Sequence, residues 1–155
     1  MGFALPAGIG AALACPKQPV VVIAGDGAFQ CNIQELQTVW RNQLPLKMIV
    51  INNHCHGMVR QFQESYFESR FQSTMWGYST PDFVKVAAAY NIPARRVQHS
   101  DEVAAALQWL WENPLAPMLL EIDIASTVNV YPKMAFGRPI TEMEPLSKPK
   151  EMEGT

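Results

Sequence analysis

The sequence has few charged residues: Asp, Glu, Lys and Arg make up 17% of its 155 residues, and the formal net charge is −2. A chain without a surplus of basic residues lacks the electrostatic surface that binds nucleic acid, so we expect no nucleic-acid partner. The hydrophobic share of 48% instead indicates a single domain with a well-packed core.

Cysteine is also scarce. The three residues Cys15, Cys31 and Cys55 are an odd number and cannot form a disulfide framework. In an α/β pattern they indicate free thiols, which are typical of a reducing compartment. The cysteine content therefore predicts a cytoplasmic protein.

The N-terminal segment lacks the features of a targeting sequence. Its first sixteen residues are uncharged and end in Ala12-Leu13-Ala14-Cys15, which resembles a secretory or lipoprotein signal. However, the segment has no basic region, and glycine and proline interrupt its apolar run. It is also too short to span a bilayer. We interpret it as a buried helix and expect no membrane partner.

Two short apolar runs, residues 20–24 and 46–51, stand out in the rest of the chain. Their β-branched, nearly uncharged composition is typical of parallel strands buried on both faces. Residues 29–42 between them predict one crossover helix. Further strands are expected at 94–98 and 117–124, with helices between them. This alternation predicts an α/β fold: a three-layer parallel sheet with helices on both faces.

Smaller signals predict the boundaries of the later elements. Thr80 and Pro81 are a suitable N-cap and first residue for a helix. Residues 100–102 are expected to cap the next helix, and residues 66–78 have no period and suit a mobile lid. The sequence thus divides into a domain at 1–125 and an irregular extension at 126–155, which we expect to drape over a surface or to be partly disordered.

A polar residue pattern follows each of the first two strands. Gly25-Asp26-Gly27 ends the first, and Asn52-Asn53 ends the second. Ligands of open α/β sheets bind at the carboxyl ends of strands, so Asp26 and Asn53 are expected to meet there. A carboxylate and an amide oxygen suit Mg²⁺ beside a phosphorylated ligand, and the N–H groups after Gly27 can cradle an anion.

Each of these residues also has an ordinary structural interpretation. Asp26 can cap the helix that follows it, and Asn53 can bond to loop backbone. His54-Cys55-His56 is a possible zinc site, but successive loop side chains diverge and no second cluster has the usual spacing. Met58 is an ordinary core residue type.

The combined motifs resemble a known family. Gly25-Asp26-Gly27-Ala28-Phe29 followed by Asn52-Asn53 and Gly57-Met58-Val59-Arg60-Gln61 resembles the thiamine diphosphate site of the large catalytic subunit of acetolactate synthase. The first eleven residues resemble the segment that opens the same domain. The resemblance covers residues 1 to about 125 and implies the thiamine diphosphate-binding fold, with thiamine diphosphate and Mg²⁺ as cofactors.

The resemblance also implies roles for individual residues. Mg²⁺ ligands would be Asp26, Asn53 and the backbone carbonyl of Cys55, with the N–H groups of His56 and Gly57 near the diphosphate. Met58 would hold the cofactor in its bent shape, and Met1 would lie near the aminopyrimidine. Glu35 receives no role. The implied cofactor-binding residues are Met1, Gly25, Asp26, Gly27, Ala28, Asn53, Cys55, His56, Gly57 and Met58.

The implied activity is decarboxylation of pyruvate or another 2-keto acid and transfer of the remaining fragment to an acceptor. Phe62 stands where the family usually has a pocket-lining tryptophan that favours 2-ketobutyrate as the acceptor, so either acceptor choice is altered or Phe62 is a tolerated aromatic. The activating glutamate belongs to a pyrimidine-binding domain that this sequence lacks. That domain would come from the rest of a longer, oligomeric chain or from a second subunit. A non-catalytic nucleotide-binding module is the alternative, but it predicts a Gly-x-Gly-x-x-Gly turn.

Overall fold

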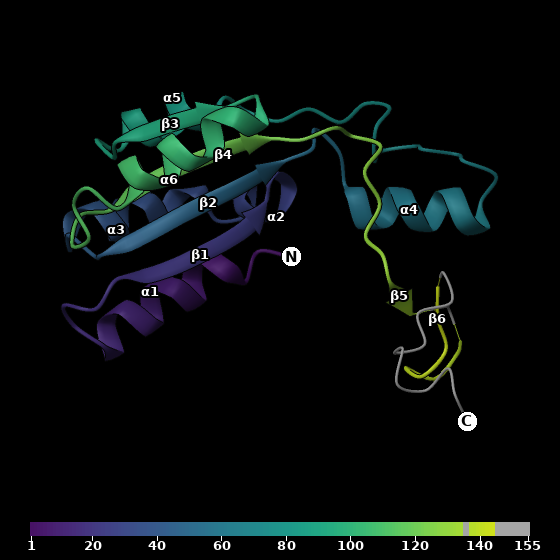
Figure 1. Cartoon of the computed structure of the whole chain (residues 1–155), viewed down its shortest axis with the longest axis horizontal. Helices are drawn as coiled ribbons and strands as arrows, with labels where there is room; N and C mark the ends of the chain where they lie inside the picture. Colours follow the sequence, from purple (N-terminus) through teal and green to yellow (C-terminus); the bar gives the residue numbers. More distant parts are fainter. Residues whose placement is uncertain (135–136, 145–155) are drawn as a thin grey trace.

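The computed structural model describes residues 1–134 and 137–144, and its centre is a four-stranded parallel sheet (Figure 1). The strands are β1 (Val20–Gly25), β2 (Leu46–Asn52), β3 (Ala94–Val97) and β4 (Met118–Asp123), in the spatial order β1-β2-β4-β3. All pairs are parallel, so the carboxyl ends of the strands lie at one edge.

One face of the sheet carries the larger core. It is covered by α1 (Ala4–Ala14), α2 (Asp26–Gln30), α3 (Leu36–Arg41) and α5 (Phe83–Ala89). Their apolar side chains pack on inward-facing strand residues, including Val22, Met48 and Leu119. Burial of such side chains is the main favourable contribution to folding.

The other face packs against α6 (Val103–Leu110), which follows the short 3₁₀ helix η2 (Ser100–Glu102). Leu110 of α6 and Leu120 of β4 are both fully buried in this second core. Helices therefore lie on both faces of a parallel sheet, and the predicted three-layer α/β fold is confirmed.

The helix α4 (Gly57–Tyr66) lies beyond the carboxyl edge of the sheet, away from the layers (Figure 1). The chain that leaves β4 runs past α4 and then forms a small antiparallel pair, β5 (Lys133–Met134) with β6 (Met143–Glu144). None of the helices described is both long and apolar enough to cross a membrane.

The structure corrects the prediction that the first strand is buried on both faces. β1 is an edge strand of the described sheet, and its alternate side chains Val21 and Ile23 are 47% and 61% exposed. A run of β-branched residues has the same appearance in an edge strand and in a central one, because the pattern contains no information on its neighbours.

The single crossover helix expected at 29–42 is also wrong. Asn32 leaves the helical conformation, with φ −137°, and its side-chain amide donates to the carbonyl of Gly2. The crossover is therefore divided into α2, the 3₁₀ helix η1 (Ile33–Glu35) and α3. An asparagine that bonds to distant backbone competes with the helical hydrogen bonds around it.

One predicted helix start is displaced as well. Asp82 is the N-cap of α5, because its carboxylate accepts a hydrogen bond from the Lys85 N–H at 3.1 Å, so neither Thr80 nor Pro81 begins the helix. Before α6, residues 100–102 have the predicted capping role: Glu102 is the N-cap residue of α6, and its carboxylate accepts the N–H groups of Gln98 and His99.

Candidate active site

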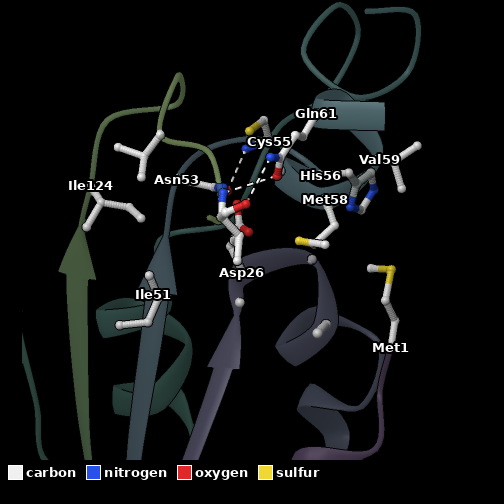
Figure 2. Close-up of a pocket in the computed structure, with 16 residues that line it drawn as sticks. Met1, Asp26, Ile51, Asn53, Cys55, His56, Met58, Val59, Gln61 and Ile124 are labelled. Carbon is white, nitrogen blue, oxygen red and sulfur yellow. Dashed lines mark hydrogen bonds between the residues drawn. The ribbon is translucent and has the colours of Figure 1, made fainter. Parts of the chain in front are cut away.

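A cavity of about 340 Å³ lies at the carboxyl ends of β1 and β2, beside the first turn of α4 (Figure 2). All ten residues that the sequence resemblance links to the cofactor line this cavity. They are Met1, Gly25, Asp26, Gly27, Ala28, Asn53, Cys55, His56, Gly57 and Met58. The eleventh predicted site residue, Phe62, is not part of the lining.

Asp26 begins α2 directly after β1 and is only 3% exposed. Its buried Oδ2 atom makes no hydrogen bond within the part of the chain that the structure describes, and neither does the hydroxyl of Tyr78, which is buried close to this carboxylate. Desolvation raises the pKa of Asp26, and the Gly27 N–H and the Tyr78 side chain act in the opposite direction. A buried carboxylate oxygen without a donor has the character of a cation ligand, so this position fits a metal ion.

The loop after β2 is shaped by two consecutive side-chain turns. Asn52 Oδ1 accepts the His54 N–H at 3.0 Å, and Asn53 Oδ1 accepts the Cys55 N–H at 3.2 Å. His54 has a positive φ of 53°, a left-handed conformation in which histidine is enriched among non-glycine residues. The turns leave Asn53 in the cavity wall, beside Asp26 (Figure 2).

The Asp26 carboxylate, the Asn53 side-chain oxygen and the Cys55 carbonyl are oxygen ligands of the type that binds hard cations. The Cys55 carbonyl accepts the Gly57 N–H at 3.0 Å, and Asn53 Oδ1 accepts one bond, but each of these oxygens has a second lone pair. Together with the carboxylate of Asp26, they are the kind of ligands that Mg²⁺ binds when phosphate and water complete its shell. The residues present therefore fit a magnesium ion.

The two N–H groups expected near a diphosphate are already bonded. The His56 N–H donates to the Thr74 carbonyl at 3.0 Å, and the Gly57 N–H donates to Cys55. In this conformation neither N–H is free for an anion, although both residues remain in the cavity wall. Anion contacts through them require local rearrangement of residues 55–57.

Gly27 allows the close approach of two aromatic side chains. A Cβ atom at this position would lie 2.5 Å from His56 Cε1 and 2.9 Å from Tyr78 Oη. Likewise, a Cβ atom at Gly57 would lie 2.4 Å from Asn53 Nδ2. Side chains at either glycine would displace residues of the cavity wall, which gives both glycines a steric role.

Two methionines give the cavity its apolar part. Met1 and Met58 extend toward it in Figure 2. Met58 lies in the first turn of α4, and 61% of its surface is exposed. Phe62, one turn further along α4, packs instead against Tyr66 and Phe67, with ring centroids 4.7 and 5.8 Å away. Phe62 therefore lies apart from the ten predicted cofactor-binding residues that line the cavity.

The side chains of the possible zinc motif point to different partners. His54 lies 3.5 Å from the Asp123 carboxylate, the Cys55 thiol donates to the Ser126 carbonyl, and the His56 ring packs on Tyr78. Burial raises the pKa of the Cys55 thiol, which opposes formation of the thiolate that zinc requires.

Several residues of the site were missed by sequence reasoning. Tyr78, from the segment expected to be a lid, packs on His56 and lies over Gly27, and no periodicity marks it. Val128 and Val130 belong to the expected irregular extension, yet both line the cavity. Gln61 holds Val130 by two hydrogen bonds, of 3.0 and 3.1 Å, between its side-chain amide and the Val130 backbone.

Comparisons with known proteins show the family to which the chain belongs. Residues 1–122 match the family described as "Thiamine pyrophosphate enzyme, C-terminal TPP binding domain". The chain is 43% identical over 143 residues to the acetolactate synthase isozyme 2 large subunit of Escherichia coli, covering 92% of this chain and 26% of that protein. It is 39% identical over 150 residues to the acetolactate synthase large subunit of Pyropia yezoensis, covering 97% and 25%.

The fold has a solved counterpart. A thiamine diphosphate-dependent 4-hydroxybenzoylformate decarboxylase from Rhodococcus jostii superimposes with a TM-score of 0.70 at 28% identity, over 81% of this chain and 23% of that one. The chain thus spans about a quarter of the length of the relatives that it matches. With the family match over most of its length, the chain belongs to the thiamine pyrophosphate enzymes, as their C-terminal TPP-binding domain.

Proposed function

We propose that this domain holds the diphosphate and Mg²⁺ of thiamine diphosphate in a 2-keto acid decarboxylase/ligase of the acetolactate synthase type. The observation that supports this most is the buried, unpartnered Oδ2 of Asp26. It belongs to a cavity whose wall also contains Asn53 and Cys55. Pyruvate or a related 2-keto acid is the proposed substrate.

The polar residues of the cavity would bind the metal ion, and the apolar residues would contact the organic part of the cofactor. Asp26 supplies the anionic ligand that offsets the metal charge, and Asn53 and Cys55 supply neutral oxygens. Met1, Met58 and Val59 line the cavity with apolar groups that exclude water and support the organic part of the cofactor. When bound, thiamine diphosphate itself supplies the nucleophilic carbon that attacks the keto group, as is usual for cofactor enzymes.

Among the described residues that line the cavity, Asp26 is the only carboxylate, and a metal ligand cannot also transfer protons freely. The other side chain of an acid–base type in the wall is His56, whose ring packs on Tyr78. The activating glutamate that the family resemblance implies would come from a pyrimidine-binding domain, in a longer polypeptide or on a second subunit of a two-chain enzyme. Size-exclusion chromatography and co-purification of the native protein distinguish these two arrangements.

The test is calorimetric titration of the longest natural polypeptide that carries this domain with thiamine diphosphate, with and without Mg²⁺. Asp26→Ala is expected to lose the Mg²⁺ dependence and at least about tenfold in affinity. Asn53→Ala is expected to act in the same direction more weakly, because it removes a neutral ligand. Asp101→Ala, at an exposed residue of η2, is the matched control and is expected to bind normally.

Titration with ATP and NAD in the same experiment examines the nucleotide-binding alternative. Unchanged affinity and Mg²⁺ dependence in Asp26→Ala would contradict the assignment of the metal site. Tighter binding of ATP or NAD than of thiamine diphosphate would instead favour a nucleotide-binding module.

A further inference from the structure

Glu121 is a carboxylate in the middle of the buried strand β4, with 0% of its surface exposed. Its neighbours Leu119 and Leu120 are apolar core residues, as expected for a central strand. Removing a charge from water is costly, and a buried ion pair is often no more stabilising than apolar residues of similar size. Stability alone therefore does not explain an ionised group at this position.

The hydrogen bonds of Glu121 connect the core to the loop that follows β2, which contains Asn53. Its Oε1 accepts the side-chain amide of Asn52, the last residue of β2, at 2.8 Å. Its Oε2 accepts Nε and Nη2 of Arg96 on β3, at 3.0 and 2.9 Å. The same Arg96 guanidinium reaches the Asp82 carboxylate at 2.9 Å, at the start of α5.

This arrangement fixes which way the Asn52 side chain faces. A carboxylate only accepts hydrogen bonds, so the NH₂ group of Asn52 has to point toward Glu121. The Oδ1 atom of Asn52 then points to the other side, where it accepts the His54 N–H at 3.0 Å. That bond closes the turn in which His54 takes its positive φ and in which Asn53 joins the cavity wall.

We propose that Glu121 is a positioning residue for the magnesium site: through Asn52, it sets the turn that presents Asn53 to the metal. The inference rests on the proposed function, because it assigns Glu121 a role at that same site. Arg96 holds the carboxylate in its orientation, so the ion pair acts on the loop through one side-chain amide and touches no ligand atom itself.

Lys47 provides a matched control for the effect of removing a buried charge. It is also fully buried, on the neighbouring strand β2, and its Nζ donates to the carbonyls of Asn113 and Ala116 at 2.5 and 2.6 Å. Lys47 lies near the start of β2, whereas Asn52 ends the same strand at the site. Lys47→Met therefore disturbs the core without disturbing the turn.

The test variant is Glu121→Gln, which keeps the shape of the side chain. The introduced NH₂ group has to face either the Asn52 amide or the Arg96 guanidinium. Both are donors, so one hydrogen bond is lost in either orientation.

A second substitution restores the pattern of donors and acceptors. Asn52→Asp alone places two carboxylates against each other. In the double variant Asn52→Asp/Glu121→Gln, the new amide donates to the new carboxylate and its oxygen accepts from Arg96. The donor–acceptor pattern is then complete again, and the His54 N–H retains its acceptor.

The first readout needs no cofactor: hydrogen exchange at the His54 and Cys55 amides of the metal-free, full-length protein. Exchange there is expected to rise in Glu121→Gln, remain at the wild-type level in Lys47→Met and recover in the double variant. The second is the Mg²⁺ concentration that half-saturates thiamine diphosphate binding. It is expected to rise about tenfold in Glu121→Gln, to stay within about twofold in Lys47→Met, and to return most of the way in the double variant.

The two proposals fail in different ways. If Glu121→Gln changes loop exchange and Mg²⁺ demand no more than Lys47→Met does, or if Asn52→Asp does not reverse its effect, the positioning role is overturned. If the wild-type protein shows no Mg²⁺-dependent binding of thiamine diphosphate, the proposed function is overturned. The exchange data on the His54 turn then decide alone whether Glu121 orders this loop.

Discussion

The imidazole ring of His56 packs against the phenol ring of Tyr78, with ring centroids 4.4 Å apart and planes inclined by 57°. The pair lies directly over Gly27, at distances that leave no room for a Cβ atom. The turn after β1, the loop after β2 and the segment before α5 therefore meet at one point, beside Asp26.

Gly27→Ala is expected to weaken thiamine diphosphate binding at least severalfold, because the added methyl group displaces the His56–Tyr78 pair and the loop that carries Asn53. Calorimetric titration measures this effect. Gly10→Ala is the matched control, since Gly10 lies on α1 outside the cavity lining and no described residue beyond its own helix comes within 4 Å of its added Cβ. Equal affinity in the two variants would contradict the steric role of Gly27.

The two glycines of α1 are expected to respond in opposite ways to alanine. A Cβ atom at Gly8 would lie 2.2 Å from Val22 Cγ2, so Gly8→Ala should destabilise the protein by about 1–3 kcal/mol. Beyond its own stretch of helix, no described residue has a heavy atom within 4 Å of a Cβ added at Gly10, and Gly10→Ala should stabilise by about 0.5–1 kcal/mol through helix propensity. Urea unfolding measures both values; a stabilising Gly8→Ala would show that α1 does not pack on β1 as described.

Asp82 is expected to make stability depend on acid pH. The Lys85 N–H, and then the Arg96 guanidinium, hold the pKa of Asp82 below its usual value. Because the folded state favours the ionised form, this contribution is fully present above the unfolded pKa of about 4 and is lost as pH falls through the lower folded pKa.

Two substitutions separate the charge of Asp82 from its cap. Asp82→Ala should cost about 1 kcal/mol at neutral pH and flatten the acid part of the stability profile. Asp82→Asn keeps a good N-cap and should flatten the profile with a smaller loss at neutral pH. Thermal unfolding across the acid range measures both. An unchanged acid limb in both variants would assign the pH dependence to other carboxylates.

Phe62→Trp is expected to shift acceptor choice in the complete enzyme toward 2-ketobutyrate. Tryptophan adds volume and an N–H donor, and such a change in a pocket alters discrimination by about 1–3 kcal/mol. Phe62 lies outside the lining of the described cavity, so this effect requires that the acceptor substrate extends along α4 as far as Phe62. A competition assay with pyruvate and 2-ketobutyrate measures the ratio, and Phe67→Trp in the same aromatic cluster is the control. A strong 2-ketobutyrate preference already present with Phe62, and unchanged by the substitution, would contradict it.

The 155-residue chain by itself is expected to bind thiamine diphosphate weakly, to turn over no pyruvate and to self-associate. The cavity wall has one carboxylate among its described residues, and apolar side chains such as Met58, Val59 and Phe67 are exposed around α4. Product analysis and light scattering examine these points. Acetolactate or acetaldehyde formed by the purified chain would show that the acid–base group lies within it.

The α/β alternation and the place of the site follow from the sequence alone. Apolar strand runs followed by Gly25-Asp26-Gly27 and Asn52-Asn53 required that these residues lie at one sheet edge, because the carboxyl ends of parallel strands meet there. The family resemblance then selected ten residues, and the structure places all ten around one cavity. Their roles as ligands remain predictions.

The contacts between segments far apart in the sequence follow only from the tertiary fold. Local patterns contain no information on which strand forms an edge, so the exposure of Ile23 was not predictable, and the helix break at Asn32 depends on its bond to Gly2. The support of the site has the same origin. Tyr78 reaches Gly27, Gln61 holds Val130, and Glu121 orients Asn52 across separations that no periodicity encodes. Hydrogen bonds and steric fit depend on spatial proximity, and only the folded chain creates that proximity.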